Sequence, residues 1–121
     1  MTMNLPFDNP LFLIPSMSGL IFMLAGFIML KFPPKKINSL YGYRTNSSMK
    51  NQERWDFSQK YSAIEMIKLA ALLVLSSIIG LVYNPDSKLG MFLGLALMIL
   101  MVVFLIIRVE KAIKDKFRNE K

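Results

Sequence analysis

The sequence contains no cysteine and no histidine in its 121 residues. These absences exclude thiol nucleophiles, disulfides, imidazole bases and the usual zinc ligands. The sequence also has no GxGxxG motif, no Walker A motif and no cluster of residues spaced to bind a metal. We therefore expect no catalytic residues, no metal site and no cofactor, and we interpret the chain as a protein that is not an enzyme.

Charged residues are almost absent from three long stretches of a chain that is 54% hydrophobic. Each stretch has about twenty residues, and a helix of that length crosses the hydrocarbon core of a bilayer. We expect transmembrane helices at about residues 11–31, 64–83 and 89–109. The N-terminal ten residues include no Lys or Arg and do not resemble a signal peptide, so the first run is expected to remain as a span. The predicted fold is all-α: one integral membrane domain over residues 1–121, with three transmembrane helices and a structured cytoplasmic loop between the first two.

The 15 basic residues are concentrated in two segments. Seven lie between Lys31 and Lys60 and six lie from Arg108 onwards, whereas the N-terminus has none. Basic residues are enriched in the cytoplasmic segments of membrane proteins. We therefore predict a cytoplasmic loop at residues 32–61, a cytoplasmic tail at residues 110–121 and an N-terminus outside. This topology explains the net charge of +7 without a nucleic acid partner.

The loop divides into a turn-rich half and a helical half. Residues 37–46 contain a glycine between two tyrosines and several Asn and Ser residues, a composition typical of an ordered turn. Ser47 or Ser48 is predicted to cap a helix that begins near Met49. Because no helix-breaking residue follows until Gly80, we expect this helix to continue directly into the second span.

A distinctive polar cluster lies in the turn-rich half, and two interpretations of it stay open. In the first, the tyrosines belong to the interfacial aromatic belt and Arg44 is one of the cytoplasmic charges. In the second, the cluster binds a ligand, since glycine permits backbone conformations that other residues disfavour and Arg44 offers five donors to a carboxylate or a lipid phosphate. Trp55, on the expected helix, is either an interfacial anchor or packs over the turn. The candidate motif and ligand-binding residues are Asn38, Tyr41, Gly42, Tyr43, Arg44, Thr45 and Trp55.

Glu65 and Lys68 are the ionisable residues set well into a predicted span. Their i, i+3 spacing places them on one helix face, where we expect an intramembrane charged pair. Small residues at four-residue spacing, Ser76 with Gly80 and Gly90 with Gly94, favour close helix packing. We expect them to join the second span to the third, with dimerisation as the alternative.

The segment Asn38-x-x-Tyr-Gly-Tyr-Arg-Thr45, followed by Glu53-x-Trp55 and a span, resembles the SdpI-type immunity proteins. In that family such a motif lies between two transmembrane helices, and the resemblance carries the motif positions onto Asn38, Gly42, Arg44, Thr45 and Trp55. It implies a protein of the bacterial cytoplasmic membrane that protects the cell against a secreted, membrane-active peptide toxin. The best-known members also draw a cytoplasmic repressor to the membrane, and the longer members have additional N-terminal spans.

Two functions are therefore carried forward. The leading hypothesis is an immunity protein that binds or blocks the toxin. The alternative is a membrane-tethered signalling adaptor that recruits a cytoplasmic partner through the basic loop. An intramembrane enzyme using Glu65 or Lys68 is disfavoured, because the chain lacks His and Cys. The expected partners are a peptide toxin, a cytoplasmic repressor and membrane lipids, with an oligomer as a further possibility.

Overall fold

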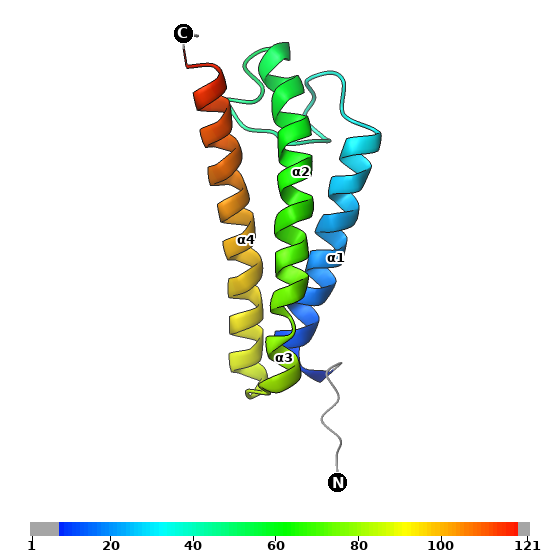
Figure 1. Ribbon diagram of the computed structural model, residues 1–121, viewed down its shortest axis with the longest axis vertical. Helices are drawn as coiled ribbons and strands as arrows, with labels where there is room; N and C mark the ends of the chain where they lie inside the picture. The colour runs from blue at the N-terminus through cyan, green and yellow to red at the C-terminus, as the bar shows by residue number, and fades with distance from the viewer. Residues whose placement is uncertain (1–7, 119–121) are drawn as a thin grey trace.

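The computed structural model describes residues 8–118, and every regular element within this range is helical. Three long helices, α1 (Pro10–Lys31), α2 (Gln52–Ser76) and α4 (Ser87–Lys116), lie side by side, and the short α3 (Ile79–Val82) joins the last two (Figure 1). The stretches Pro10–Lys31, Gln52–Val82 and Ser87–Lys116 are each long and apolar enough to cross a membrane. The predicted all-α fold with three spanning helices is confirmed, and the architecture is that of a multi-pass membrane protein.

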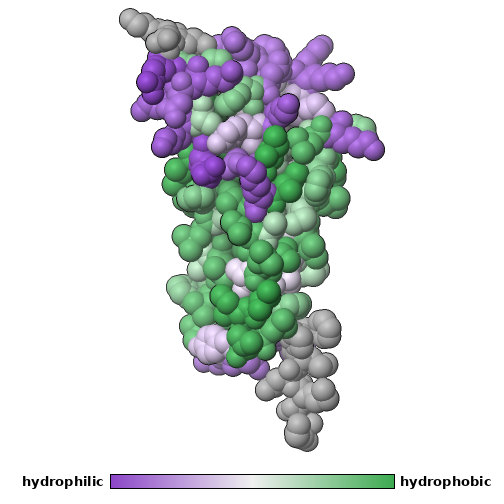
Figure 2. All heavy atoms as spheres, viewed as in Figure 1, coloured by the Kyte–Doolittle hydropathy of each residue, from purple (hydrophilic) through white to green (hydrophobic). Residues whose placement is uncertain are grey.

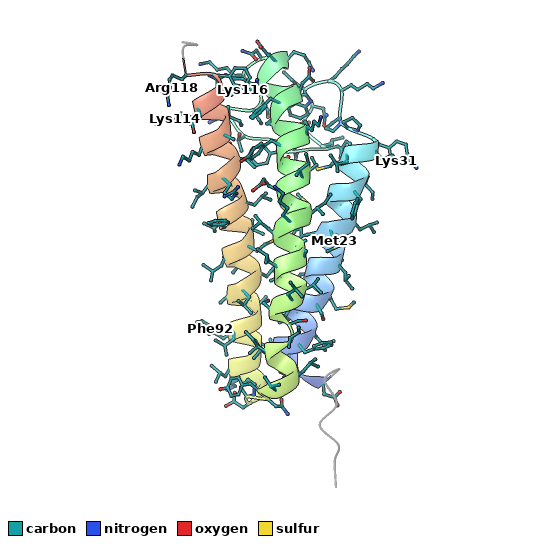
Figure 3. All side chains as sticks on the ribbon, in the orientation of Figure 1. Met23, Lys31, Phe92, Lys114, Lys116 and Arg118 are labelled. Atoms are coloured by element: carbon teal, nitrogen blue, oxygen red, sulfur yellow. The ribbon has the colours of Figure 1, made fainter. Side chains whose placement is uncertain are left out.

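The bundle has one strongly polar end and a long apolar body. At the polar end α1 and α4 finish, α2 begins, and residues 32–51 fold beside the helix ends (Figure 1). Hydrophilic residues gather at this end, and hydrophobic residues cover the body below it (Figure 2). Lys31, Lys114 and Lys116 lie at the polar end, whereas Phe92 points outward from the apolar body with 68% of its surface exposed (Figure 3). An apolar exposed surface of this kind is what lipid requires of a spanning protein.

At the end of the bundle far from the polar end, α1 begins at an asparagine, Asn9, that also bonds to α3. The Oδ1 of Asn9 accepts a hydrogen bond from the N–H of Leu11 at 3.0 Å, and Pro10 occupies the first helical position. The Nδ2 of Asn9 donates to the carbonyl oxygens of Gly80 at 2.8 Å and Tyr83 at 3.0 Å. Carbonyls at a helix end have no partner within the helix, so this one buried side chain satisfies backbone groups of both α1 and α3.

The start of α2 differs from the prediction. Its N-cap is Asn51, whose Oδ1 accepts a hydrogen bond from the N–H of Arg54 at 2.9 Å. The prediction that Ser47 or Ser48 caps this helix was therefore wrong. Ser48 is fully buried in the turn before the helix, where its Oγ donates to the carbonyl oxygen of Tyr43 at 3.1 Å.

α2 runs from the polar end directly into the second span, which confirms the predicted continuity of this helix, and it is interrupted near the far end of that span. α2 stops at Ser76, and Ser77 donates its N–H to the carbonyl oxygen of Val74 at 3.1 Å. Bonds between residues three apart tighten the chain locally, as in a 3₁₀ turn. At this interruption two serines bond back to the preceding turn, Ser77 Oγ donating to Val74 O at 2.5 Å and Ser76 Oγ to Leu73 O at 2.6 Å.

Glycines allow the helices to approach closely. A Cβ added at Gly19 of α1 would lie 3.0 Å from the carbonyl oxygen of Ala70 on α2. A Cβ at Gly94 of α4 would lie 3.0 Å from both the Cβ of Ile14 and the carbonyl oxygen of Pro10, on α1. The expectation that Gly94 and its neighbour Gly90 pack the third span against the second was therefore wrong, because both face the start of α1.

α4 remains a packed helix well beyond the apolar stretch expected at residues 89–109. Its buried residues Leu105, Val109 and Ile113 recur every fourth position and form one cluster with Phe117. Phe57 and Tyr61 of α2 pack against this cluster. The segment from residue 110 is thus held in place by its own apolar face as far as Lys116.

Candidate functional site

Trp55 fastens the loop to α2 at the polar end. Its side chain is fully buried, and its Nε1 donates a hydrogen bond to the carbonyl oxygen of Pro34 at 2.6 Å. Proline cannot donate a backbone hydrogen bond but keeps its carbonyl as an acceptor, which the indole N–H satisfies here. Trp55 is therefore packed inside the fold, and its indole bonds to the segment that precedes the turn.

Gly42 occupies a backbone conformation that strongly favours glycine. Its φ angle is +109°, and among residues 8–118 no other residue has a positive φ. A Cβ at this position would collide with the Oε1 of Gln59 and lie 2.7 Å from the Cγ of Pro34. Glycine is therefore favoured at this position for two reasons: the backbone has a left-handed φ, and it lies too close to α2 for a Cβ.

Gln59 is a central residue of this site, and the sequence patterns did not single it out. Its amide pairs with the backbone of Tyr43: Oε1 accepts from the Tyr43 N–H at 2.6 Å and Nε2 donates to the Tyr43 carbonyl oxygen at 2.8 Å. The side chain is only 2% exposed. The available signal was its position four residues after Trp55, on the same face of α2.

Asn38 and Tyr41 shape the outer part of the loop. The Oδ1 of Asn38 accepts hydrogen bonds from the N–H groups of Leu40 at 2.9 Å and Tyr41 at 2.7 Å, forming an Asx turn. The hydroxyl of Tyr41 donates to the carbonyl oxygen of Phe32, just after α1, at 2.7 Å. Both side chains therefore bond to the loop itself.

Arg44 lies at the surface of the same loop. Its Nη1 donates a hydrogen bond to the carbonyl oxygen of Ser39, and the residue as a whole is exposed. Arg44 also lines a small cavity of about 240 Å³ with Gly42, Thr45 and Met66. Among the candidate residues, Arg44 is thus an exposed cation that also borders a cavity.

A carboxylate from α4 receives hydroxyl groups from three loop residues. The Oε2 of Glu110 accepts hydrogen bonds from Tyr43 Oη at 2.6 Å and Thr45 Oγ1 at 2.9 Å, and its Oε1 accepts one from Ser47 Oγ at 2.5 Å. Hydrogen bonds to an ionised acceptor are stronger than neutral ones. This cluster attaches the loop to the end of α4.

The Glu110 cluster perturbs the phenol of Tyr43. Burial, together with the hydrogen bond to Glu110 and the negative charge of that carboxylate, raises the pKa of Tyr43 well above its ordinary value. Tyr43 therefore remains a hydrogen-bond donor throughout the physiological pH range. Sequence reasoning missed Glu110, because its partners lie more than sixty positions away and no local spacing relates them.

Glu65 lies deeper in the bundle and has two basic neighbours. Lys68 approaches it at 3.3 Å on the same helix, as the spacing suggested, and Arg108 of α4 donates its Nε to Glu65 Oε1. The Glu65 side chain is 6% exposed, whereas those of Lys68 and Arg108 are 67% and 44% exposed. The interhelical contact with Arg108 gives the buried carboxylate a partner that the sequence alone did not indicate.

The predicted residues therefore fall into three groups. Gly42, Tyr43, Thr45 and Trp55 converge on the contact between the loop, α2 and α4. Asn38, Tyr41 and Arg44 bond within the loop and its approach from α1. Glu65 and Lys68 form a separate cluster with Arg108. Within residues 8–118 no three acidic side chains come together as metal ligands would.

Comparison with known proteins supports the relation suggested by the loop motif. A model of the SdpI/YfhL protein family matches residues 35–108, a range that includes all the candidate loop residues. The uncharacterized protein YfhL of Bacillus subtilis (strain 168) is 41% identical over 88 residues, which cover 73% of this chain and 68% of that protein. No solved structure matches the chain. On the strength of the matched range and of this identity, the chain belongs to the SdpI/YfhL protein family.

Proposed function

We propose that this protein is a bacterial immunity protein that binds or blocks a secreted, membrane-active peptide toxin in the cytoplasmic membrane. Membership of the SdpI/YfhL family is the observation that carries the proposal. In the proposed topology the N-terminus is outside and the polar end is cytoplasmic, because the basic residues gather at that end. The role is recognition, without chemistry of its own.

The contacts of the motif suggest how such a protein works. Trp55, Gly42 and Tyr43 hold the loop against α2 and α4, so these three residues are part of the scaffold. A toxin arriving from outside does not need to reach the cytoplasmic loop if that loop sets the position of the helices. Arg44 is an exposed residue of the motif, and it provides the cation available to a ligand that inserts deeply.

A lipid-facing groove between α2 and α4 offers a surface for the toxin in this proposal. It has a volume of about 340 Å³ and is lined by apolar side chains that include Leu73, Met101 and Phe104. A membrane-active peptide reaches this surface from within the bilayer, where packing rather than the hydrophobic effect drives helix association. Filling the groove by Met101→Trp is expected to reduce protection while the loop contacts persist.

The experiment is expression in a toxin-sensitive strain, with survival measured against toxin concentration. The wild-type chain is expected to protect, and Gly42→Val is expected to abolish protection by detaching the loop. Lys114→Ala, an exposed change at the same end of the bundle, is the matched control and should protect fully. Absence of protection by wild-type protein that is present and inserted would refute the immunity function.

The proposed topology has a direct test, because the chain has no cysteine. Single-cysteine variants at exposed Ser39, in the loop, and exposed Ser87, at the start of α4, can be labelled in whole cells with a membrane-impermeant maleimide. Ser87→Cys is expected to react and Ser39→Cys to react only after the cells are opened. The reverse pattern would invert the topology.

A second candidate function is a membrane-tethered adaptor, favoured by the exposed basic surface of the polar end. Its exposed lysines are Lys31, Lys35, Lys36, Lys50, Lys60, Lys111, Lys114 and Lys116. Such a surface fits an acidic cytoplasmic partner, including a repressor. Co-purification of a partner that is lost on charge reversal at Lys35 and Lys36, with no toxin present, would favour the adaptor over the immunity function.

A further inference from the structure

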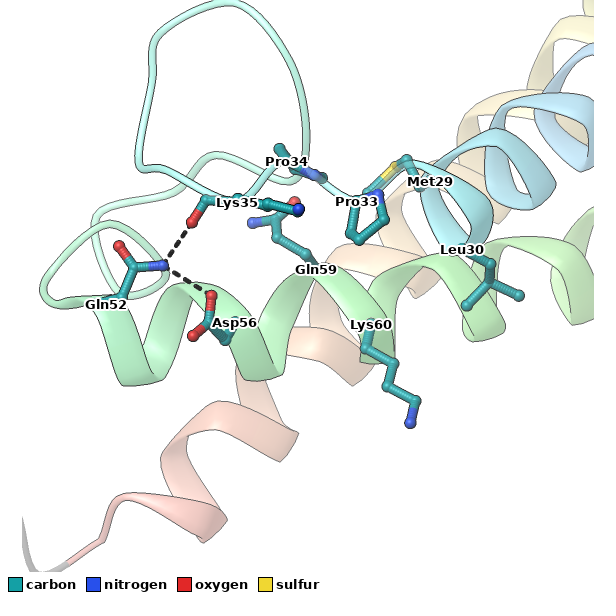
Figure 4. Close-up of a pocket in the computed structure, with 9 residues that line it drawn as sticks. All are labelled: Met29, Leu30, Pro33, Pro34, Lys35, Gln52, Asp56, Gln59 and Lys60. Atoms are coloured by element: carbon teal, nitrogen blue, oxygen red, sulfur yellow. Dashed lines mark hydrogen bonds between the residues drawn. The ribbon is translucent and has the colours of Figure 1, made fainter.

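A cavity at the polar end lies apart from the Glu110 and Glu65 clusters. It is open to the surface, has a volume of about 550 Å³ and is lined by the end of α1, the segment that follows it and the first turns of α2 (Figure 4). Its apolar side is formed by Met29, Leu30 and Pro33, and its polar side includes Lys35, Asp56 and Lys60. The cavity thus joins one apolar wall to a charged rim.

The walls of this cavity are held by hydrogen bonds. Gln52 donates its Nε2 to the carbonyl oxygen of Lys35 at 2.6 Å and to Asp56 Oδ1 at 2.7 Å (Figure 4). Trp55 fixes the adjacent Pro34 by the 2.6 Å bond already described. The connecting segment therefore cannot close the cavity without breaking both contacts, so the space is preformed.

Three charged side chains border the cavity without neutralising one another. Lys35 reaches from the connecting segment, and Asp56 and Lys60 come from α2 on the facing wall (Figure 4). All three are exposed, and within residues 8–118 none of them has an ion-pair partner. Two cations and one carboxylate beside the same space favour a ligand that carries both an anion and a cation.

The cavity lies at the depth of the lipid headgroups. The apolar run of α1 ends at Leu30, directly before Lys31, and the large hydrophobic side chains exposed on α2 begin at Ile64, one turn beyond Lys60. The cavity therefore spans the boundary between the apolar body and the charged end. Headgroups of the bilayer occupy that boundary, outside the hydrocarbon core.

We propose that this cavity binds the headgroup of an aminophospholipid, the chemistry of phosphatidylethanolamine. Asp56 accepts the primary ammonium, Lys35 and Lys60 neutralise the phosphate, and Met29 and Leu30 contact the glycerol and upper acyl region. The proposal does not rest on toxin binding, and its Lys35 and Lys60 also belong to the basic surface considered for the adaptor. It assigns a lipid ligand to residues outside the family motif.

The experiment is native mass spectrometry of the full chain in detergent, titrated with phosphatidylethanolamine, phosphatidylglycerol and phosphatidylcholine. Phosphatidylethanolamine is expected to bind about tenfold more tightly than the other two, because only its headgroup brings to Asp56 a cation that also carries N–H donors. Asp56→Asn should remove this preference, and Lys35→Gln with Lys60→Gln should weaken all three lipids. Lys114→Gln, the same charge change away from the cavity, should leave all three unchanged.

Other outcomes would overturn the proposal. Equal retention of the three lipids, or unchanged binding by the Asp56 and lysine variants, would exclude an aminophospholipid site. Water-soluble glycerophosphoethanolamine binding as tightly as the lipid would assign the cavity to a free ligand. If the Asp56 and lysine variants abolish toxin protection but leave lipid binding intact, the cavity binds the toxin peptide and not the lipid. Blue-shifted emission from Trp55, the sole tryptophan, verifies in each variant that the loop remains folded.

Discussion

Tyr43, in the loop, donates its hydroxyl to Glu110, near the end of α4, across 2.6 Å and 67 positions of sequence. The backbone of Tyr43 is held at the same time by Gln59 of α2. One residue of the family motif therefore connects the loop to two helices. The motif is thus the point at which the polar end of the bundle is assembled.

Glu110→Gln is expected to destabilise the protein by about 1–3 kcal/mol, because one neutral amide replaces a carboxylate that accepts three hydroxyl hydrogen bonds. Thermal unfolding in detergent measures the change. Asp115→Asn removes a carboxylate from the same helix, where it forms an exposed surface pair with Arg118 at 3.6 Å, and should have little effect. Equal losses in the two variants would show that the hydroxyl cluster contributes no specific stability.

The phenol of Tyr43 is expected to ionise at a pH well above its ordinary pKa of 10.0, since burial and Glu110 raise that pKa. Because the folded state favours the protonated phenol, the resulting stability is fully present below pH 10 and is lost as the pH rises beyond it. The tyrosinate absorbance difference between wild type and Tyr43→Phe isolates this titration. Glu110→Gln should lower the pKa of Tyr43 toward its ordinary value. An unchanged Tyr43 titration in this variant would show that Glu110 does not raise the pKa of the phenol.

Gly42→Ala is expected to detach the loop from α2, at a cost of about 2 kcal/mol or more, since it combines a left-handed φ with a collision at Gln59. Acrylamide quenching of Trp55 and proteolysis within residues 32–51 should both increase. Gly90→Ala serves as the control, because its Cβ would meet its nearest atom at 3.4 Å, an ordinary contact. Full protection of Trp55 in Gly42→Ala would contradict the assigned role of the glycine.

Arg108→Ala is expected to lower the melting temperature more than Lys68→Ala. Both remove a partner of buried Glu65, but Arg108 joins two helices whereas Lys68 lies on the same helix and is the more exposed. A double-mutant cycle with Glu65→Gln measures each coupling. A larger coupling for Lys68 would show that the interhelical contact is incidental.

Several features of this protein follow from local sequence properties alone. Apolar length and composition determined the spanning helices, because a bilayer accepts only segments that satisfy their own backbone and expose apolar side chains. The glycine between two tyrosines correctly indicated an ordered turn, since a left-handed φ is a property of one residue. The spacing of Glu65 and Lys68 placed them together for the same local reason.

The sequence was less informative where several residues could satisfy the same backbone group. Ser47, Ser48 and Asn51 are all suitable helix caps, and local preference does not choose among them. The choice depends on Ser48 being buried and bonded to Tyr43, which leaves Asn51 to begin α2. Likewise, the small residues of α4 indicated a close contact but not that α1 would be the partner.

The loop that carries the motif thus has some properties fixed by its own sequence and others fixed by packing. Its existence, its polarity and its glycine turn were determined by the sequence. That Trp55 bonds to Pro34, Gln59 to Tyr43 and Glu110 to three hydroxyls was decided only by the tertiary structure. The physical reason is that these bonds join polar groups brought together by helix packing, and helix packing depends on shape across the whole bundle, whereas the spacing of residues reports only on neighbours along one helix.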